Sequence, residues 1–318
     1  MVDFRSFHNA DPPRLLQLWH SCALGRCAAE GFACDILEIF TFSQPFFDRK
    51  GMILAVDDGR VVGCVHAGFG PNADETGLDR TQGTLAALMV HPGWRRRGIG
   101  RELVRRAEDY LRQSGAQNVE AGGGLDKNGF YVGIYGGLQP SGFAADSTPW
   151  SEFFQACGYQ SGRETIVLSR DLRSSRDPVS ARQIRNRRNM KLVISDRPSG
   201  HSWWWFVRFG QLDSLTIQLC SNTDEEIVAT GQIVGLDVFI PKWGVRSVGV
   251  RDIFVPESKR RQGYAMTLLL EICKRFRQES VSLIQAHVDA NDAISRGLFE
   301  SVNFEDEERM LTFTRDLT

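Results

Sequence analysis

The sequence has no excess of charge of one sign and no apolar run long enough to cross a bilayer. Its 38 basic and 39 acidic side chains give a formal net charge of −1. It therefore offers no broad field for nucleic acid or an anionic membrane, and any anion site must be local. The first residues, MVDFRSFHNADPP, contain no apolar core of a signal peptide. These absences predict a cytoplasmic protein without a nucleic-acid or membrane partner.

Paired cysteine spacing is also missing. The seven cysteines are an odd number, which is typical of reduced thiols in a cytosolic chain. His20, Cys22, Cys27 and Cys34 lie close together, but no C-x2-C spacing joins them, and Cys22 falls in an apolar helical stretch. Buried small side chains explain this group better than zinc does, so we predict no metal site.

The length of the chain predicts two domains, because 318 residues is about twice a usual domain. A boundary is expected in RSSRDPVSARQIRNRRNMK, residues 173–191, which is rich in arginine and has no apolar period. We interpret this stretch as a solvated linker or surface helix rather than a phosphate or nucleic-acid patch. The expected domains are 1–172 and 191–318, joined by an arginine-rich linker over 173–190. The second domain lacks the helices expected before its first hairpin.

Each half carries the same order of elements around one turn. In the first half an apolar strand over 83–90 precedes a turn at Gly98 and then a helix. In the second half a strand over 248–255 precedes a turn at Gly263 and another helix, with the same spacing of eight residues from strand end to glycine. An α/β fold with a mixed sheet is therefore expected in each half. Apolar residues at every fourth position predict the buried stripes of the two helices: Ile99, Leu103, Ala107 and Leu111, then Tyr264, Leu268, Ile272 and Phe276.

The repeated turn has a composition suited to an anion. Its pattern R-x-x-G-x-[GA] is filled by Arg95, Gly98 and Gly100, and again by Arg260, Gly263 and Ala265. Small residues let successive main-chain N–H groups point into one concavity, and the following helix adds the positive end of its dipole. Flanking arginines supply charge-assisted hydrogen bonds. The turn is neither a P-loop nor a Rossmann fingerprint, and a pyrophosphate would fit it well.

This order of elements resembles the GNAT superfamily of N-acetyltransferases. FFQACGY (153–159) and LFESVNF (298–304) are both similar to the family's later signature, L-Y-x-x-x-G-F. The resemblance covers about 1–172 and about 212–318, so the chain looks like two GNAT-like acyl-CoA N-acyltransferase domains in tandem. It implies an N-acetyltransferase that carries an acetyl group from acetyl-CoA to a primary amine of a small molecule or peptide by direct attack. The alternative is a non-catalytic acyl-CoA-binding or regulatory protein with degenerate domains.

The resemblance also implies where acetyl-CoA (coenzyme A) is held. Main-chain amides of the turn bind its pyrophosphate, and the preceding strand pairs with its pantetheine arm. The implied residues of the first half are Leu88, Met89, Val90, Arg95, Arg96, Arg97, Gly98, Ile99, Gly100 and Arg101. Those of the second half are Ile253, Phe254, Val255, Arg260, Arg261, Gln262, Gly263, Tyr264, Ala265 and Met266.

The acid that protonates the leaving thiolate is not at its family position. That tyrosine is replaced by Phe154 in the first half and by Phe299 in the second. A thiolate is a tolerable leaving group, so this loss need not abolish transfer. Tyr131 and Tyr135 are candidates for the acid, although tyrosines in such a loop more often line a substrate pocket.

The carboxylate that the resemblance implies as base is also missing from the first half, because TLAALMV (84–90) carries none. Asp252 lies on the matching strand of the second half and is the candidate base; the other interpretation is a salt bridge with Arg251 or with an arginine of the linker. Glu75 and Asp79 could reach the slot only by folding over it. His91 is expected to cap a turn.

Two aromatic segments remain. YVGIYGGLQPSGF (131–143), with its glycines and tyrosines, is either the acceptor-binding element or a surface loop. WWWF (203–206) is expected to seal a domain interface or to replace the missing helices, with an aromatic acceptor pocket as the alternative.

Overall fold

The computed structural model describes residues 1–146, 149–174, 176–196 and 201–318. The chain forms two compact units that are discontinuous in sequence. Unit 1 contains Met1–Thr165, Ser202–Gln211 and Arg309–Thr318, and unit 2 contains Ile166–His201 and Leu212–Glu308. These units are groups of packed residues and differ in kind from the two repeated domains expected at 1–172 and 191–318. The boundaries of those domains stay a prediction.

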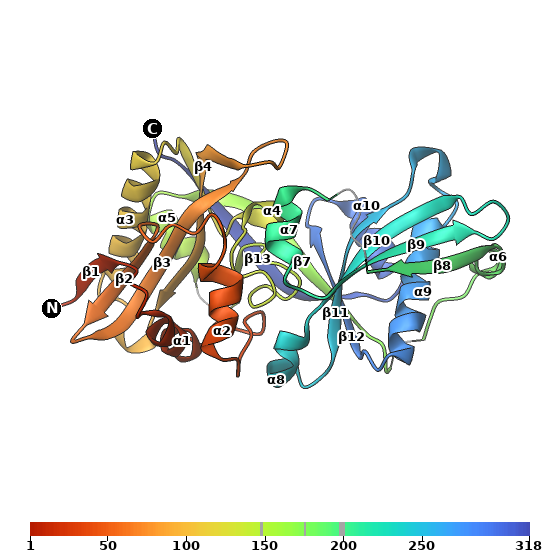
Figure 1. Cartoon of the computed structure of the whole chain (residues 1–318), viewed down its shortest axis with the longest axis horizontal. Coiled ribbons are helices and arrows are strands. Elements are labelled where there is room, and N and C mark those ends of the chain that lie inside the picture. The colour runs from red at the N-terminus through yellow and green to blue at the C-terminus, as the bar shows by residue number, and fades with distance from the viewer. Residues whose placement is uncertain (147–148, 175, 197–200) are drawn as a thin grey trace. The chain divides into compact units, whose positions relative to one another are not determined.

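Unit 1 is a mixed sheet with helices; in Figure 1 its residues 1–165 run from red to yellow-green, α7 is green and the end of β13 is blue. Its strands are β1 (Asp3–Ser6), β2 (Met52–Asp57), β3 (Arg60–Pro71), β4 (Leu78–Val90), β5 (Asn118–Ala121), β6 (Phe143–Ala144), the start of β7 (Gln160–Asp171) and the end of β13 (Glu305–Asp316). Its helices are α1 (Pro12–Ser21), α2 (Cys34–Leu37), the π-helix η1 (Glu38–Phe42), the 3-10 turn η2 (Pro92–Trp94), α3 (Ile99–Gln113), α4 (Gly124–Lys127), α5 (Trp150–Ala156) and α7 (Trp203–Phe209). The strand order is β1-β2-β3-β4-β5-β13. Strands β4 and β5 run parallel, whereas the other neighbouring strands in this order run antiparallel.

Helix α3 buries the stripe that the sequence predicts. Ile99, Leu103, Ala107 and Leu111 are each no more than 4% exposed. They pack with Val65 and other core residues of the sheet. Fixing α3 on the sheet in this way places its N-terminus at the end of β4, which is the position the repeated turn requires.

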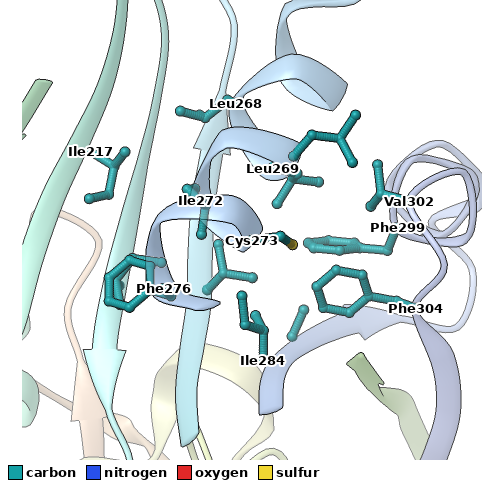
Figure 2. Packing of buried hydrophobic residues seen from close by; sticks show 14 of the residues in the cluster. Ile217, Leu268, Leu269, Ile272, Cys273, Phe276, Ile284, Phe299, Val302 and Phe304 are labelled. Atoms are coloured by element: carbon teal, nitrogen blue, oxygen red, sulfur yellow. The ribbon is translucent and has the colours of Figure 1, made fainter. Parts of the chain in front are cut away.

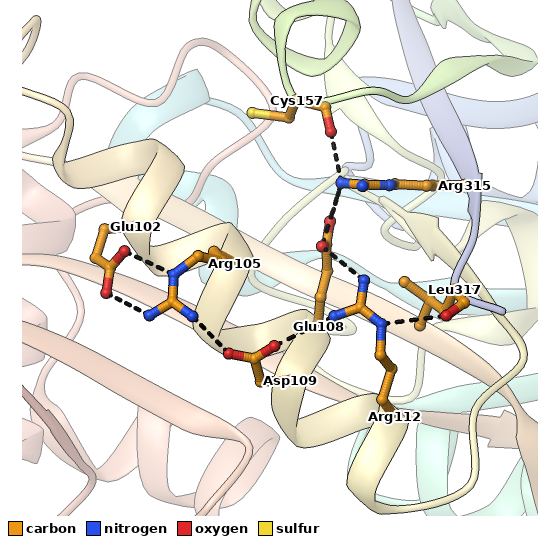
Figure 3. Close-up of polar contacts among 8 residues, drawn as sticks. All are labelled: Glu102, Arg105, Glu108, Asp109, Arg112, Cys157, Arg315 and Leu317. Carbon is orange, nitrogen blue, oxygen red and sulfur yellow. Dashed lines mark hydrogen bonds and ion pairs between the residues drawn. The ribbon is translucent and has the colours of Figure 1, made fainter.

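The end of β13 extends the sheet of unit 1 beyond β5. Phe313 and Asp316 pair antiparallel with Ala121 and Asn118 of β5. Arg315 donates to the Cys157 carbonyl at 2.6 Å and to both oxygens of Glu108, at 3.0 and 3.2 Å. Figure 3 shows this network linking β13, α3 and the residue that follows α5. Residues 309–318 are therefore part of unit 1.

Unit 2 repeats the strand–turn–helix–strand order. Its elements are the rest of β7 and the start of β13, α6 (Ala181–Asn189), β8 (Met190–Ser195), β9 (Ser214–Ser221), β10 (Ile227–Gly235), η3 (Asp237–Phe239), α8 (Ile240–Trp243), β11 (Ser247–Phe254), η4 (Glu257–Lys259), α9 (Tyr264–Gln278), β12 (Leu283–Asp289) and α10 (Ala293–Glu300). The strand order is β7-β12-β11-β10-β9-β8. Figure 2 shows the core between α9, α10 and the sheet, where Leu268, Ile272 and Phe276 meet Ile284 and Phe299.

Two segments left open by the sequence are helices. Residues 181–189 of the arginine-rich stretch form α6, which packs against α9 within unit 2. WWWF begins α7, which belongs to unit 1. It therefore does not take the place of the helices that unit 2 lacks. Trp204 is 1% exposed, and its indole donates to the Asp126 carbonyl at 2.7 Å. In the part of the chain that the structure describes, no helix has the length and apolarity that crossing a membrane requires.

Candidate functional site

A slot opens in unit 1 where β4 and β5 part. The two strands pair only from Gln82 to Leu85 with Asn118 to Ala121, and β5 then ends. A register shift between β3 and β4, which leaves Ala86 without a paired residue, marks the same place. From Leu88 to Val90, β4 pairs with β3 on one side, and no described strand pairs with its other side. That stretch of main chain is the one assigned to pantetheine from the sequence.

The turn after the slot is open at its outer face. Gly98 has a φ of +81°, which an L side chain adopts only under strain, and a Cβ built there would have no atom within 4 Å. It caps the N-terminus of α3, whose first N–H groups have no partner inside the helix. Arg96 is also left-handed, at +63°. The turn therefore presents main-chain donors and a helix dipole to open space, as an anion site requires.

Arg95 has a structural part in this turn. Its Nε donates to the Val90 carbonyl at 3.0 Å, and one terminal nitrogen donates to the Cys22 carbonyl at 3.1 Å. The guanidinium thus ties the turn to the end of β4 and to the end of α1. The same side chain adds positive charge beside the predicted pyrophosphate position.

A cavity of about 260 Å³ connects the slot with the turn. Its walls combine predicted residues with a set of aromatic side chains from unit 1. The lining residues are Trp19, Cys22, Ala23, Leu24, Ala86, Ala87, Leu88, Met89, Val90, Trp94, Arg95, Arg96, Ile99, Gly100, Tyr131, Tyr135, Phe143, Pro149, Trp150 and Phe153. Of the residues assigned to acetyl-CoA in the first half, Arg97, Gly98 and Arg101 do not line it. The structure thus brings most of that set to one cavity with both candidate tyrosines.

The tyrosine-bearing segment is held inside unit 1. Tyr131 stacks on Trp19 with ring centroids 6.0 Å apart, and Tyr135 meets the same indole edge-on at 6.3 Å. The Ala29 N–H donates to the Ile134 carbonyl at 2.8 Å, so the chain after α1 and this segment support each other. Residues 130–143 are buried except at position 135, which is half-buried. The segment is therefore not a surface loop, which was one of the two interpretations of its sequence.

His66 is a residue that the sequence analysis missed. It lies on β3, is fully buried, and its Nδ1 is 3.1 Å from the Tyr131 hydroxyl. Burial lowers the pKa of His66 to about 3, so the ring is neutral. Burial also raises the pKa of Tyr131 well above its usual value, which keeps the phenol protonated. The sequence feature that could have identified His66 is its position as the one histidine in the mostly apolar stretch that forms β3.

The turn of unit 2 has the same backbone conformation as the turn of unit 1, but side chains of α6 lie against it. Gly263 has a φ of +83°, and Arg260 Nε donates to the Val255 carbonyl at 3.2 Å, as Arg95 does to Val90. A Cβ at Gly263, however, would lie 2.9 Å from Cδ of Arg182 on α6.

A second residue of α6 binds this turn directly. Asn186 donates to the Gln262 carbonyl and to the Thr267 hydroxyl, each at 3.1 Å. Thr267 in turn donates to Gln183 at 2.8 Å. Side chains of the arginine-rich helix therefore occupy space beside Gly263 that is open beside Gly98.

The candidate carboxylates are all engaged by neighbours. Asp252 accepts from Arg251 Nε at 2.9 Å and lies at an irregularity of β11 with a φ of +51°. In unit 1, Glu75 accepts a hydrogen bond from the Ser202 hydroxyl, and its carbonyl accepts from the Trp204 N–H. Asp79 accepts from the Thr81 hydroxyl at 2.7 Å. The ion pair with Arg251 and a catalytic role for Asp252 do not exclude each other, and the latter stays a prediction.

The remaining candidates occupy structural positions. His91 accepts from the Gly93 N–H at 3.1 Å, which confirms the expected turn cap. Phe154 and Phe299, at the family's tyrosine positions, are 0% and 6% exposed.

Comparison with known proteins places this geometry in a family. The profile of the acetyltransferase (GNAT) family matches the chain twice, over residues 14–132 and 186–304. No curated protein matches the sequence at a significant level.

Solved structures similar to the chain share its fold. A GCN5-related glucosamine N-acetyltransferase region of a fungal multi-domain GH3 beta-N-acetylglucosaminidase has a TM-score of 0.71 at 16% identity, over 99% of this chain and 38% of that one. A tandem GNAT protein from the clavulanic acid biosynthesis pathway has a TM-score of 0.68 at 17% identity, over 100% and 99% of the chains. A GCN5-related N-acetyltransferase from Sphaerobacter thermophilus has 0.63 at 15% identity, over 99% and 96%. The predicted α/β fold with two domains of this kind in tandem is confirmed.

Proposed function

Because the chain belongs to the acetyltransferase (GNAT) family, we propose that it transfers an acetyl group from acetyl-CoA to the amine of a small molecule or peptide, and that unit 1 does so. The observation that carries the proposal is the slot beside Leu88–Val90 together with the uncovered turn at Gly98. Both are needed, because one would hold an extended thiol arm and the other a pyrophosphate.

The residues present fit acetyl-CoA, which would supply an activated thioester. Main-chain groups of Leu88, Met89 and Val90 on the unpaired side of β4 would hydrogen-bond to the pantetheine arm as a further strand does. The N–H groups between Arg96 and Gly100 would receive the pyrophosphate. An N–H of the splayed strand would also stabilise charge that develops on the carbonyl oxygen during attack.

Tyr131 is the proposed acid for the departing thiolate. It lines the cavity, and its hydroxyl has His66 as its partner. His66 Nε2 has no hydrogen-bond partner among the described residues. A buried N–H without an acceptor is rarer than a bare acceptor, so we assign the imidazole proton to Nδ1. His66 then donates to the tyrosine oxygen, which leaves the phenolic proton free for transfer and would stabilise the phenolate while that proton is shared.

One acetyl-CoA site per chain follows from the difference between the two turns. In unit 2, Arg182 and Asn186 of α6 lie where the turn at Gly98 is open. The rival function, a non-catalytic acyl-CoA-binding protein, is favoured by the absence of a carboxylate on 84–90 and of the family's tyrosine at Phe154.

Release of free thiol separates the two functions. The purified chain is mixed with acetyl-CoA and a panel of amines, and both coenzyme A and acetylated amine are quantified. An acetyltransferase forms the two products in equal amounts above the rate without protein. Tight binding of acetyl-CoA with no product from any amine would instead establish the non-catalytic function.

A further inference from the structure

The cavity of unit 1 carries formal charge of one sign only. Among the described residues that line it, the ionisable groups of fixed charge are the guanidiniums of Arg95 and Arg96. The described part of the chain contributes no aspartate, glutamate or histidine to its lining. Arg95 is anchored to two carbonyl oxygens and so stays in place.

This charge pattern disfavours an ammonium acceptor. Moving a cation from water into an apolar site that offers it no counter-charge is costly. An alkylamine resembles lysine, whose pKa is about 10.4, so only about a thousandth of it is neutral near pH 7. None of the described lining residues has a carboxylate or imidazole that could remove its proton. An acceptor that is already neutral in solution avoids both costs.

The cavity walls also favour a flat ring. Trp19, Tyr131 and Tyr135 form one contiguous aromatic cluster on the wall, and Phe143, Trp150 and Phe153 form another. The first cluster is rigid, because the Trp19 indole donates to the Ala29 carbonyl at 2.9 Å and Ala29 itself binds Ile134. Aromatic walls of this kind gain from stacked or edge-on contact with another ring.

We propose that the acceptor is an aromatic amine, in which the nitrogen is bonded directly to the ring; this rests on the acetyltransferase function proposed above. The amine nitrogen forms a bond to the acetyl carbon, and the carbon–sulfur bond breaks with its electron pair on sulfur. The attacking nitrogen loses one proton to water, and the sulfur gains one from Tyr131, which water then replenishes. The products are the acetylated amine and free thiol.

Two isomeric amines test the proposal on the wild-type chain. In para-ethylaniline the nitrogen is on the ring, whereas in phenethylamine it ends an alkyl chain, and the two have the same atoms and nearly the same volume. We expect kcat/KM at pH 7 to be at least tenfold higher for para-ethylaniline and to change little between pH 6.5 and pH 8. For phenethylamine, kcat/KM should rise about tenfold per pH unit, because only the neutral fraction reacts.

The opposite results are equally clear. A higher kcat/KM for phenethylamine at pH 7, or a plateau below the pKa of that amine, would show a base or counter-charge in the site and overturn the aromatic acceptor. No product from any amine would overturn the acetyltransferase proposal itself. Product from alkylamines alone would leave that proposal standing and remove this one.

A designed carboxylate gives a second readout. Cys22 lines the cavity, and its carbonyl accepts from Arg95, so Cys22→Asp places an anion on the wall and Cys22→Asn serves as its uncharged control. Relative to the control, Cys22→Asp should shift the kcat/KM ratio at least tenfold toward phenethylamine. An unchanged ratio in a folded Cys22→Asp variant would contradict the inference that missing negative charge sets the preference. If Cys22→Asp does not fold, the comparison of para-ethylaniline with phenethylamine on the wild-type chain still tests the aromatic acceptor.

Discussion

Replacing Arg315 by methionine should destabilise unit 1 through a carboxylate left buried. The Glu108 side chain is 4% exposed and receives two hydrogen bonds from Arg315. Once these are lost, Arg112 at 3.3 Å remains as an ion-pair partner. Removing one partner of a buried pair costs about 3–5 kcal/mol, and the remaining contact with Arg112 reduces the expected loss to about 2–4 kcal/mol. For a unit of this size that is a fall in Tm of about 5–12 °C.

Arg309→Met is the matched control, because it removes an arginine from the same strand. Arg309 pairs with Glu164 at 3.4 Å, with side chains 66% and 36% exposed. An exposed pair of this kind contributes about 0–1 kcal/mol. Calorimetry of both variants should show a large shift of the unit 1 transition for Arg315→Met only.

Two outcomes would refute the reasoning. Equal shifts in the two variants would show that the burial of Glu108 carries no energetic weight. A shift confined to the other unit's transition would show that the end of β13 does not stabilise unit 1.

Three further predictions concern single side chains. Tyr131→Phe should lower kcat in the thiol-release assay at least tenfold with little change in the affinity for acetyl-CoA. Tyr135→Phe, measured in the same way, should keep most of the activity. Equal losses of kcat in the two variants would contradict the role of Tyr131 as the acid. His66 has a folded pKa of about 3, below its value of about 6.5 in an unfolded chain, so its contribution to stability is present above pH 6.5 and is lost as the pH falls below it. His66→Phe should therefore flatten the fall in unit 1 stability between pH 6.5 and pH 4, and an unchanged slope would contradict its burial. Burial alone would raise the pKa of Asp177, but hydrogen bonds from Arg277 and Arg170 outweigh burial and lower the pKa. Asp177→Asn should therefore cost unit 2 about 2–3 kcal/mol at pH 7, measured by urea unfolding, and less at a pH below the pKa of an unfolded aspartate. An equal cost at both pH values would refute the stabilising role of these hydrogen bonds.

The sequence was sufficient for features set by neighbouring residues. The helix stripe Ile99, Leu103, Ala107 and Leu111 is periodic, and the glycine turns lie next to the strands that position them. The two turns were predicted as equivalent because their local patterns are the same. These features determine the backbone of the slot.

Features made by distant parts of the chain were not predictable in the same way. Arg315 and Glu108 are 207 positions apart, and the helix that covers Gly263 lies about eighty residues before it in sequence. His66 and Tyr131 are 65 positions apart, and no local pattern pairs an imidazole with a phenol. Such contacts depend on tertiary packing, so the sequence showed two similar turns where the structure shows one open and one covered.

The central claim is that acetyl-CoA binds at the open turn beside Gly98. Gly98→Val and Gly263→Val impose the same backbone strain, of about 1–2 kcal/mol, because both glycines are left-handed. Only the first places a side chain in the proposed pyrophosphate position. Calorimetric titration with acetyl-CoA should give one site per chain for the wild type, an unchanged Kd for folded Gly263→Val, and a Kd at least tenfold higher for Gly98→Val. An unchanged Kd for Gly98→Val, or a loss of binding in Gly263→Val alone, would contradict the account.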